Sequence, residues 1–507
     1  MSYTVFLYCV LSGFLTVIAF PKPCLFLIIW ISFIPLIYVI LNKEAKYSFV
    51  YGLLSGLIFN ILGLYWIVPT LKFYIGILKA CILAFLLCIY LSLYWGIWST
   101  TVKFFSNIIS NNINFIAVSS CIWVLLEYLR TYLLTGFPWL LIGHSQFNLL
   151  PIIQIVEFTG VYGVSFLIIF VNFCCYFFLI PQTSINSLIK SNLSKKTQYI
   201  TVPIITIMLI VIIGKMRLYK FQFVGKDSLK IAIIQPNIEQ YKKLDCGYIN
   251  EILSKLSKYA LLISQQKCDL AIWPETVIPA CIPQNKYILY YIKRMLYKTH
   301  CFNLLGTVYN NINGQQSNVI IVINQNKIVL LHKKQHLIPF GEYFPLQLKP
   351  ITKMFVSFNQ LENFVKGTDI NIFQYKNIYL GTLICSENFS PDIARRFVLC
   401  GAKILTNHAN DAWFDNTSAL YQHFIMNVFR AIENRKVVIV SSNSGISGII
   451  NISGSIVKQT LASKNDFIVA SVMQNNFKTI YTKYGDIFVK ICLIFLLLMY
   501  LIYNPYI

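Results

Sequence analysis

Eight long apolar segments constrain this chain more than any other feature of its sequence. They lie at about 4–20, 24–41, 48–68, 73–97, 112–130, 160–180, 199–214 and 487–504. A helix needs roughly 20 consecutive apolar residues to cross a bilayer. Only 12% of the residues are charged, whereas soluble globular proteins carry about 25%. The sequence therefore predicts an integral membrane α-helical bundle of about eight helices, and it excludes a soluble single-domain enzyme and a disordered chain.

The distribution of Lys and Arg between the short loops predicts the orientation of the bundle. Eight spans place both termini on the same side of the membrane. If that side is the cytoplasm, its loops carry Lys43, Lys46, Lys103, Lys190, Lys195 and Lys196. The opposite short loops carry only Lys22, Lys72 and Arg130, with Lys79 just inside the fourth span. By the positive-inside rule we expect cytoplasmic termini and residues 215–486 on the outer side. The first segment lacks a basic start and a cleavage site, so we expect a span rather than a signal peptide.

Residues 215–486 have the pattern of a folded α/β domain. Apolar runs of strand-like alternation lie at 230–238, 270–275, 319–334, 378–387, 402–411 and 436–457. Helical patterns lie near 248–264, 285–298, 390–399 and 418–435. The step Gln325–Asn326 predicts a hairpin turn inside the third run. Alternating strands and helices indicate a layered domain. The predicted domains are therefore 1–214 for seven helices, 215–486 for the α/β domain and 487–507 for the last helix.

The basic character of the chain does not indicate nucleic acid. The sequence has 42 Lys and Arg against 19 Asp and Glu, a net charge of +23. Such an excess suits either nucleic acid or an anionic membrane surface. Because the apolar segments already favour a membrane, we expect contact with membrane lipid and no nucleic acid. The 14 cysteines form neither a C-x-x-C pair nor a zinc-ligand pattern, so we expect no metal.

Three candidate catalytic residues lie at the ends of apolar runs: Glu275, Lys334 and Cys385. Each alone has an ordinary explanation, as a helix cap, a solvated charge or a structural cysteine. Together they form a reactive set, because a carboxylate can take the proton of a thiol and an ammonium can stabilise a thiolate and an oxyanion. The backbone N–H of Ser386 would be a second oxyanion donor. The set predicts acyl transfer through a thioester.

The sequence around these residues resembles the nitrilase, or carbon–nitrogen hydrolase, superfamily, whose fold is an α-β-β-α sandwich. The loop KQHLIPFGEYFP at 334–345, with eight spans around the domain, narrows the resemblance to the apolipoprotein N-acyltransferase family. Further similar segments are Gly136–Trp139 with Gly143 and Gln146, Gln235–Ile238, Asn410–Phe414, Gln422–His423 and Asn443–Ser447. The resemblance covers nearly the whole chain.

The resemblance implies a role for each of the three residues. Glu275 would be the general base, Lys334 the stabiliser of thiolate and oxyanion, and Cys385 the nucleophile. Lys333 competes with Lys334. We choose Lys334 because the family's lysine stands two residues before the histidine that is His336 here.

The resemblance also implies supporting residues and two departures. Glu342 matches a glutamate that supports the lysine, and Glu387 matches the glutamate two residues after the cysteine. Ser386 stands where the family often has an aromatic residue, and Leu244 stands near a frequent tryptophan. Both departures concern the packing of the acyl chain or the acceptor rather than the reacting groups.

The implied reaction belongs to bacterial lipoprotein maturation. The acyl donor would be a membrane phospholipid, and the acceptor would be the α-amino group of the N-terminal diacylglyceryl-cysteine of an apolipoprotein. The kinetics would be ping-pong, and no cofactor is required. The implied location is the bacterial inner membrane, as a multi-pass protein with the catalytic domain in the periplasm and both termini in the cytoplasm.

Two other functions remain open from the sequence. The first is a membrane-tethered nitrilase-type amidase, which shares the three residues and gives the acyl group to water. The second is a transporter or structural membrane protein with a sensor domain, in which Cys385 would be dispensable. Broken spans at matching positions in two halves of the chain would favour a transporter, and the sequence shows no such symmetry.

A few residues outside this set have more than one interpretation. Glu127 and Arg130 suggest a self-paired couple at the end of the fifth span, or else a link to the outer domain. For His408 and His423 we expect helix packing or hydrogen bonds rather than metal ligation. The stretch 345–364 is either a segment that dips into lipid and admits acyl chains or an ordinary buried loop.

Overall fold

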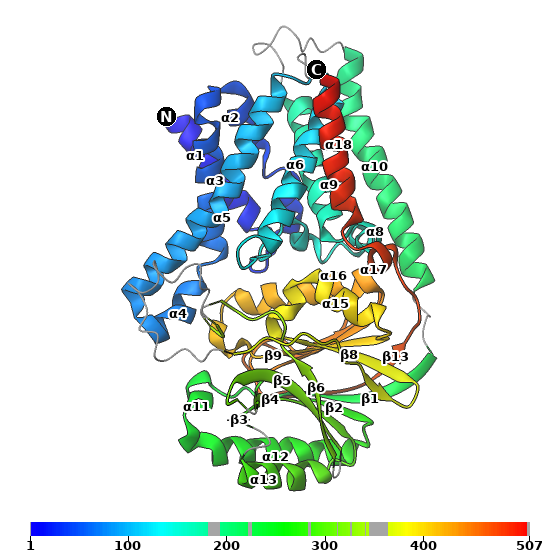
Figure 1. Ribbon diagram of the computed structural model, residues 1–507. Coiled ribbons are helices and arrows are strands. Elements are labelled where there is room, and N and C mark those ends of the chain that lie inside the picture. Colours follow the sequence, from blue (N-terminus) through cyan, green and yellow to red (C-terminus); the bar gives the residue numbers. More distant parts are fainter. Residues whose placement is uncertain are drawn as a thin grey trace. The chain divides into compact units, whose positions relative to one another are not determined.

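Two compact units make up the molecule. The computed structural model describes residues 2–180, 193–221, 226–281, 285–311, 313–324, 327–339, 341–343 and 364–503. One unit comprises Met1–Tyr219 with Tyr484–Ile507 and is helical, and the other comprises Lys220–Lys483 and is α/β (Figure 1). The expected hairpin at Gln325–Asn326 and the stretch 345–363 lie outside the described residues.

The helical unit contains both long and short helices. They are α1 (Tyr3–Val17), α2 (Ile34–Asn42), α3 (Ser48–Gly63), α4 (Ile67–Ile75), α5 (Ile77–Ser106), α6 (Asn112–Tyr132), α7 (Leu150–Ile153), α8 (Val156–Thr159), α9 (Val161–Leu179), α10 (Leu193–Lys220) and α18 (Ile487–Tyr503), with the 3₁₀ helices η1 (Phe26–Trp30), η2 (Ala45–Tyr47) and η3 (Ile142–Gln146).

Within the described residues, five helices are long and apolar enough to cross a membrane. They are Ala45–Gly63, Ile77–Ser106, Asn112–Tyr132, Val161–Leu179 and Lys196–Lys220. The expected spans at 4–20, 24–41 and 487–504 fall on the shorter apolar helices Tyr3–Val17, Phe26–Asn42 and Ile487–Tyr503. The helical membrane bundle is confirmed, whereas the number of eight spans is not.

Helices α3 and α5 pack closely because α3 presents glycine to its neighbour. A Cβ on Gly52 would overlap the backbone oxygen of Trp95 and the hydroxyl of Ser99. Small residues of this kind let two helices in a bilayer approach each other. Trp95 then stacks on Phe33, with ring centroids 5.0 Å apart, and meets Trp123 edge-on at 5.0 Å. The core of the helical unit is therefore close-packed and aromatic.

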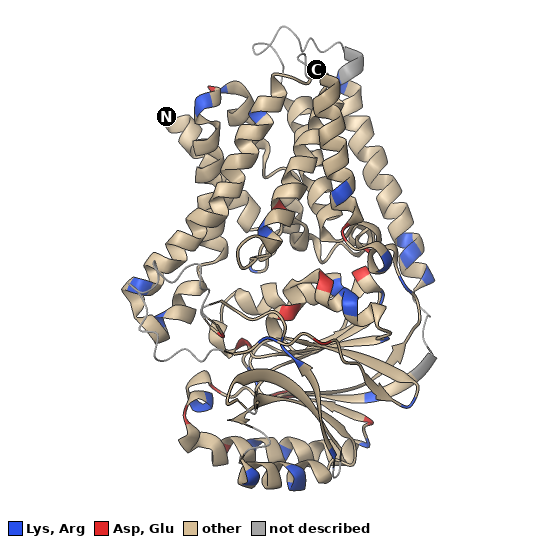
Figure 2. Ribbon diagram, in the orientation of Figure 1, with Lys and Arg blue, Asp and Glu red and all other residues tan. Residues whose placement is uncertain are grey.

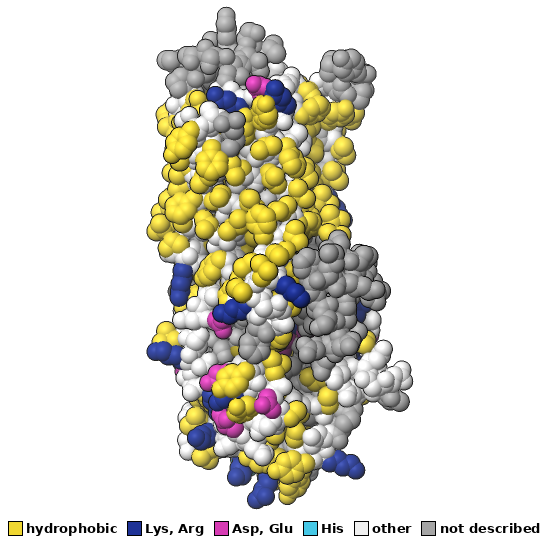
Figure 3. Space-filling model, turned by 90° about the vertical axis from the view of Figure 1, so that its left-hand side faces the viewer, with side chains coloured by type: hydrophobic (Ala, Val, Ile, Leu, Met, Phe, Trp, Pro, Cys, Tyr) yellow, Lys and Arg dark blue, Asp and Glu magenta, His cyan; other side chains and the backbone are white. Residues whose placement is uncertain are grey.

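The outer surface of the helical unit is apolar. Helices α10 and α18 expose the side chains of Ile204, Ile205, Met208, Leu209, Ile212, Ile491, Ile494, Leu497, Leu498 and Leu501. Hydrophobic side chains cover this unit in the view of Figure 3, and charged residues are sparse along its helices in Figure 2. A continuous apolar surface of this size is unstable in water and fits lipid. The chain is a membrane protein.

The α/β unit contains two mixed β-sheets. The first has the order β13-β1-β2-β4-β5-β6, with β3 paired to β4. Its strands are β1 (Lys226–Gln235), β2 (Leu270–Ile272), β3 (Ile278–Cys281), β4 (Phe302–Asn310), β5 (Gln316–Asn324), β6 (Lys327–Lys333) and β13 (Asp466–Gln474). The second has the order β12-β11-β10-β9-β8-β7. Its strands are β7 (Phe373–Tyr375), β8 (Ile378–Ile384), β9 (Ile404–Ala409), β10 (Val437–Ser442), β11 (Gly448–Ile450) and β12 (Ile456–Gln459).

Alternation along β1 explains how the layers stack. Ile231 and Ile233 point into a core shared with β8, β9 and β10 of the second sheet. Ala232 and Ile234 point the other way, into a core with α12 (Ile249–Gln266) and α13 (Lys286–Tyr297). Helices α15 (Pro391–Leu399) and α16 (Ala419–Asn434) pack on β8 and β10 (Figure 1). The expected α-β-β-α sandwich is confirmed.

Candidate active site

The three candidate residues all follow the carboxyl ends of strands. Glu275 lies three residues after β2, and Lys334 and Cys385 directly follow β6 and β8. Strands β2 and β6 belong to the first sheet and β8 to the second. The candidate site is therefore assembled from both layers of the sandwich.

A buried ion cluster joins Lys334 to two carboxylates. Its Nζ lies 3.1 Å from Oε1 of Glu275 and 2.8 Å from Oε1 of Glu342. The amide Nδ2 of Asn318, in β5, donates to the same two oxygens at 2.6 and 3.0 Å. The backbone N–H of Lys334 donates to the carbonyl of Asn318 at 2.9 Å. With Lys334 only 1% exposed, these contacts fix both carboxylates in place.

The electrostatics keep Lys334 protonated. Burial lowers the pKa of Lys334, but the carboxylates of Glu275 and Glu342 outweigh burial and hold the pKa above its ordinary value. Lys333 points elsewhere, with its ammonium 5.5 Å from the ring centroid of Tyr309. The structure thus brings Lys334, and not Lys333, to the two carboxylates.

Cys385 occupies a strained turn. It is the first residue of the 3₁₀ helix η7 (Cys385–Phe389), and its φ of +48° lies in the left-handed region. A side chain with a Cβ rarely adopts this region. Nε2 of His423 donates to the carbonyl of Cys385 at 3.3 Å, and Oγ of Ser386 donates to the carbonyl of His336 at 3.1 Å. These bonds hold the turn that begins at the candidate nucleophile Cys385, here called the nucleophile turn, in its unusual conformation.

The Cys385 thiol interacts electrostatically with both other candidates. Burial raises its pKa most, and the carboxylates of Glu275 and Asp411 raise it further. The Lys334 ammonium and the backbone N–H of Asn410 lower the pKa, but the net result lies well above the ordinary value. The resting sulfur is therefore a thiol, and a base is needed to make it a nucleophile.

Glu387 connects two segments of the site. One is β8, called the nucleophile strand because it precedes the candidate nucleophile Cys385, and the other is the segment that follows Lys334, called the lysine loop. Oε2 accepts from the N–H of Ile384 at 2.8 Å, and Oε1 accepts from the N–H of Gln335 at 2.6 Å. His332 lies 2.9 Å from Oε2. Burial raises the pKa of Glu387, but His332 and these N–H groups outweigh burial and leave the pKa below its ordinary value. The ionised carboxylate is thus a cross-link between two segments of the site.

Asp411 and His423 form a hydrogen-bonded pair beside the nucleophile turn. Nδ1 of His423 donates to Oδ1 of Asp411 at 2.6 Å, and Nε2 also reaches Oδ1 of Asn388 at 3.1 Å. Asp411, His423 and Cys385 offer possible metal-ligand atoms within 4.8 Å of one another. Because both ring nitrogens of His423 already face oxygen acceptors, the arrangement fits a hydrogen-bonded imidazolium better than a metal ligand. Burial lowers the pKa of His423, but Asp411 outweighs it and leaves the pKa raised.

His408 is hydrogen bonded as well. Its Nδ1 lies 2.6 Å from the carbonyl of Trp273, and its Nε2 lies 3.1 Å from Oγ1 of Thr406. Hydrogen bonds therefore account for the ring nitrogens of both His408 and His423.

Sequence reasoning missed Lys243, a second buried lysine of the site. It lies on α11 (Gln240–Leu244) and is 7% exposed. Its Nζ donates to the carbonyl of Glu275 and to Oγ1 of Thr276, both at 3.3 Å. Burial lowers the pKa of Lys243 to about 8. The run QYKKLDC looks like a solvated surface segment and gave no signal, whereas Asn318 was detectable as a polar residue inside an apolar strand.

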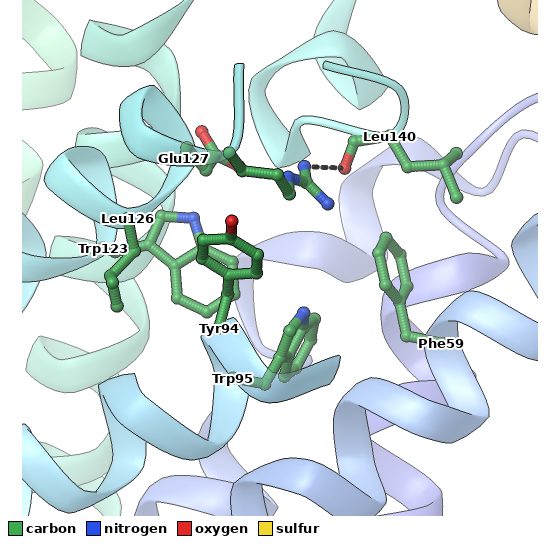
Figure 4. Close-up of a pocket in the computed structure, with 8 residues that line it drawn as sticks. Phe59, Tyr94, Trp95, Trp123, Leu126, Glu127 and Leu140 are labelled. Carbon is green, nitrogen blue, oxygen red and sulfur yellow. Dashed lines mark hydrogen bonds between the residues drawn. The ribbon is translucent and has the colours of Figure 1, made fainter. Parts of the chain in front are cut away.

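Glu127 and Arg130 of α6 line a pocket in the helical unit. Oε1 of Glu127 accepts from the N–H of Ile142 at 2.9 Å. Nη2 of Arg130 donates to the carbonyl of Leu140 at 3.3 Å, the hydrogen bond that is dashed in Figure 4. Among the described residues, the two charged groups form no ion pair with each other. The two groups still interact electrostatically, as a self-paired couple would, and each side chain also holds the segment 140–142 against α6 through its hydrogen bond. The remaining walls are mostly aromatic, with Phe59, Tyr94, Trp95 and Trp123.

Similarity to known proteins covers both units. Residues 12–174 match the apolipoprotein N-acyltransferase N-terminal domain, and residues 230–480 match the carbon–nitrogen hydrolase domain. An apolipoprotein N-acyltransferase of Geobacter metallireducens is 30% identical over 96% of this chain and 93% of its own length. One of Wigglesworthia glossinidia brevipalpis is 31% identical over 90% of this chain and 91% of its own length. The solved structure of Saccharomyces cerevisiae Nit3, a nitrilase-superfamily member, has 15% identity over 49% of this chain and 91% of its own, with a TM-score of 0.38.

Proposed function

Because this chain belongs to the apolipoprotein N-acyltransferase family, we propose that it moves a fatty acyl chain from a membrane phospholipid to an apolipoprotein through a thioester on Cys385. Membership makes it an acyltransferase of lipoprotein maturation, with a carbon–nitrogen hydrolase domain. The catalytic assignment rests on one observation, the buried cluster in which Lys334 contacts Glu275 and both act electrostatically on Cys385.

The first half-reaction forms the acyl-enzyme. Glu275 takes the proton of the Cys385 thiol, and the thiolate attacks an ester carbonyl of the phospholipid. Lys334 stabilises the oxyanion, and the backbone N–H of Ser386 is the second donor. The ester C–O bond then breaks, Glu275 returns the proton to the departing oxygen, and a lysophospholipid leaves.

The second half-reaction transfers the acyl chain to nitrogen. The α-amino group of the N-terminal diacylglyceryl-cysteine attacks the thioester carbonyl, and Glu275 takes a proton from that nitrogen. The C–S bond breaks, and the proton returns to the Cys385 sulfur. Donor and acceptor occupy the site in turn, so the kinetics are ping-pong.

Glu342 and Glu387 support the reacting groups without reacting themselves. Glu342 contacts the Lys334 ammonium and accepts from the N–H of Ile338 at 2.8 Å, which fixes the lysine loop. Glu387 links that loop to the nucleophile strand through Gln335 and Ile384. Their contacts support a role in positioning.

Intact-mass analysis of the protein purified from membranes tests the thioester. We expect a fatty acyl adduct that hydroxylamine removes and that is absent in Cys385→Ala. Cys400→Ala is the matched control, because Cys400 is an exposed cysteine of the same unit. Adding a diacylated peptide with a free amine should discharge the adduct into an amide. Discharge to water at the same rate would instead indicate an amidase, and an adduct that persists in Cys385→Ala would refute the assignment.

The proposed location is the bacterial inner membrane, with residues 215–486 as the periplasmic catalytic domain and 1–214 and 487–507 as the helical bundle with cytoplasmic ends. Cys246 and Cys400 are exposed in the α/β unit and report its side. In intact spheroplasts, a membrane-impermeant maleimide should label the peptides that contain Cys246 and Cys400, and Cys246→Ser with Cys400→Ser should remove these two adducts. Labelling only after lysis would place the domain in the cytoplasm.

A further inference from the structure

We propose that Lys243 is a positioning residue of the acyl transfer, which holds the Glu275–Thr276 turn and supplies a second positive charge near Cys385. The inference rests on the proposed function and deepens it. It assigns to the reaction a lysine outside the Glu275, Lys334 and Cys385 set.

Lys243 contacts the Glu275–Thr276 turn, whose backbone sets the direction of the Glu275 side chain. Its Nζ reaches the carbonyl of Glu275 and Oγ1 of Thr276, both at 3.3 Å. Thr276 has a φ of +39°, a left-handed conformation that β-branched residues strongly disfavour. A strained turn persists only where its surroundings hold it. Lys243 bridges the residues on both sides of this peptide and so keeps the Glu275 side chain directed at the cluster.

The same contacts bring a positive charge to the reacting sulfur. Glu275 and Cys385 are the ionisable groups that interact electrostatically with Lys243. Cys385 also interacts with Lys334 and Asp411, and Asp411 is hydrogen bonded to His423. With its side-chain amide turned by a half rotation, Asn410 accepts from Nζ of Lys243 at 3.1 Å, while its backbone N–H reaches the sulfur. Lys243 therefore favours the thiolate whenever it carries its proton.

The pH range of this effect follows from burial. Desolvation lowers the pKa of Lys243 to about 8. The ammonium is thus present at neutral pH and is lost as the pH rises through about 8. Lys334 keeps its proton over the same range, because its two carboxylate partners hold its pKa above the ordinary value. The two lysines are therefore distinguishable by titration.

The adjacent residue provides a matched control. Lys242 is on the same short helix, but its ammonium turns away from the site and pairs with Glu251 at 2.7 Å and with Glu239 at 3.4 Å. Removing the charge of Lys242 changes the same local sequence without touching Glu275 or Thr276.

The test measures Cys385 directly in the full-length protein in lipid or detergent. Iodoacetamide alkylation of the Cys385 peptide is followed by mass spectrometry from pH 6 to 10, together with the rate of acyl-enzyme formation. We expect Lys243→Met to slow both the alkylation and the acylation of Cys385 at pH 7 about tenfold, because the charge that favours the thiolate is lost. The difference in alkylation rate from the wild type should shrink above about pH 8, where Lys243 of the wild type is itself neutral. Lys243→Arg should keep the alkylation rate at pH 7 near that of the wild type but lose part of the acylation rate, because its planar fork fits the two acceptors less well. Lys242→Met should behave like the wild type.

The inference is overturned if Lys243→Met keeps the wild-type rates of alkylation and acylation at pH 7. Thermal unfolding of each variant identifies loss of fold. If Lys243→Met does not fold, Lys243→Gln, which keeps a hydrogen-bond donor without the charge, is judged by the same two rates. The alkylation rate does not require lipid transfer. Failure of the proposed function would appear separately, as an acyl adduct that persists in Cys385→Ala.

Discussion

At the scale of single residues, the carboxylate of Glu275 has two opposing effects on the nucleophile. It accepts the thiol proton in the proposed mechanism, yet its negative charge raises the pKa of the Cys385 thiol in the resting site. Lys334 compensates, because it contacts Glu275 and lowers the thiol pKa. The two effects are separable by substitution.

We predict that Glu275→Gln loses acyl transfer while its thiol becomes easier to ionise. Loss of a general base reduces the rate about 100-fold or more. Removal of the negative charge lowers the thiol pKa, so alkylation of Cys385 should reach its midpoint at lower pH than in the wild type. Glu342→Gln is the control, since Glu342 contacts Lys334 and is not among the groups that principally raise the thiol pKa. An alkylation midpoint that rises in Glu275→Gln would contradict this account.

The residues that sequence reasoning missed share one property. Lys243 and Asn318 act through partners 32 and 43 residues away, Glu275 in both cases. The local sequence does not reveal the partner of such a residue, because partners are set by the fold and not by spacing: Asn318 stands out as a polar residue in an apolar strand, whereas nothing local marks Lys243. Glu275, Lys334 and Cys385 were found because each ends an apolar run and lies in a segment that resembles a known family. Their contacts still required the fold.

At the scale of elements, the hydrogen bonds between α16 and the nucleophile turn make the stability of the fold depend on pH. His423 on α16 donates to Asp411 and to the carbonyl of Cys385. Its pKa is raised above the ordinary value of about 6.5. A raised folded-state pKa gives stabilisation that is complete below the unfolded pKa and is lost as the pH rises through the folded pKa.

We therefore predict that His423→Gln lowers the unfolding temperature most at acidic pH. The difference from the wild type should be largest near pH 6 and should shrink toward pH 9. Thermal unfolding across this range measures the effect. His300→Asn is the control, because His300 is exposed and asparagine tolerates its left-handed backbone. A difference that grows with pH would show that His423 is neutral in the fold.

A second prediction concerns the contact between α3 and α5. Alanine normally favours a helix over glycine by about 1 kcal/mol. At Gly52, however, the added Cβ would overlap the backbone of Trp95, and overpacking costs about 1–3 kcal/mol. Gly52→Ala should therefore lower the unfolding temperature in detergent. Leu62→Ala, at an exposed position of α3, should change it little. Stabilisation by Gly52→Ala would mean that the helices do not pack this closely.

The strands show where the alternation of apolar and polar residues predicts a strand correctly and where it does not. The expected runs at 230–238, 378–387 and 402–411 overlap β1, β8 and β9. Strand β4 was not expected, although it is internal to its sheet. Asn303 and Thr307 interrupt its apolar pattern, and their side chains are satisfied by Trp273 and Ala280. Because such polar side chains interrupt the apolar pattern, the sequence of this buried strand is typical of a loop.

At the scale of the whole molecule, the helical unit closes with a helix that returns after the entire α/β unit. Helix α18 packs on α6, α8 and α9, and Nδ2 of Asn114 donates to the hydroxyl of Tyr503 at 3.0 Å. Long apolar segments predicted the membrane bundle, and alternating strand and helix patterns predicted the layered domain. The number of spans was not settled in this way, because α1, α2 and α18 are apolar but short.

We predict that a chain ending at residue 486 has a less stable helical unit and an intact α/β unit. Loss of α18 uncovers Cys121 and its neighbours on α6, which are buried in the complete bundle. The first unfolding transition in detergent should shift to lower temperature, while the alkylation midpoint of Cys385 should stay unchanged. The substitution Leu497→Ala, at an exposed position of α18, should leave both values unchanged. A changed Cys385 midpoint in the shortened chain would contradict this separation.

The left-handed backbone conformation at Cys385 places the stability of the fold in opposition to the proposed catalysis. That conformation costs a side chain with a Cβ about 1–2 kcal/mol, and glycine adopts it freely. Between two inactive proteins, Cys385→Gly should thus unfold at a higher temperature than Cys385→Ala, the reverse of the usual ranking in a helix. The more stable of the two variants lacks the sulfur on which the proposed reaction depends. Selection for heat resistance alone would therefore favour glycine at this position over the residue that the proposed chemistry needs.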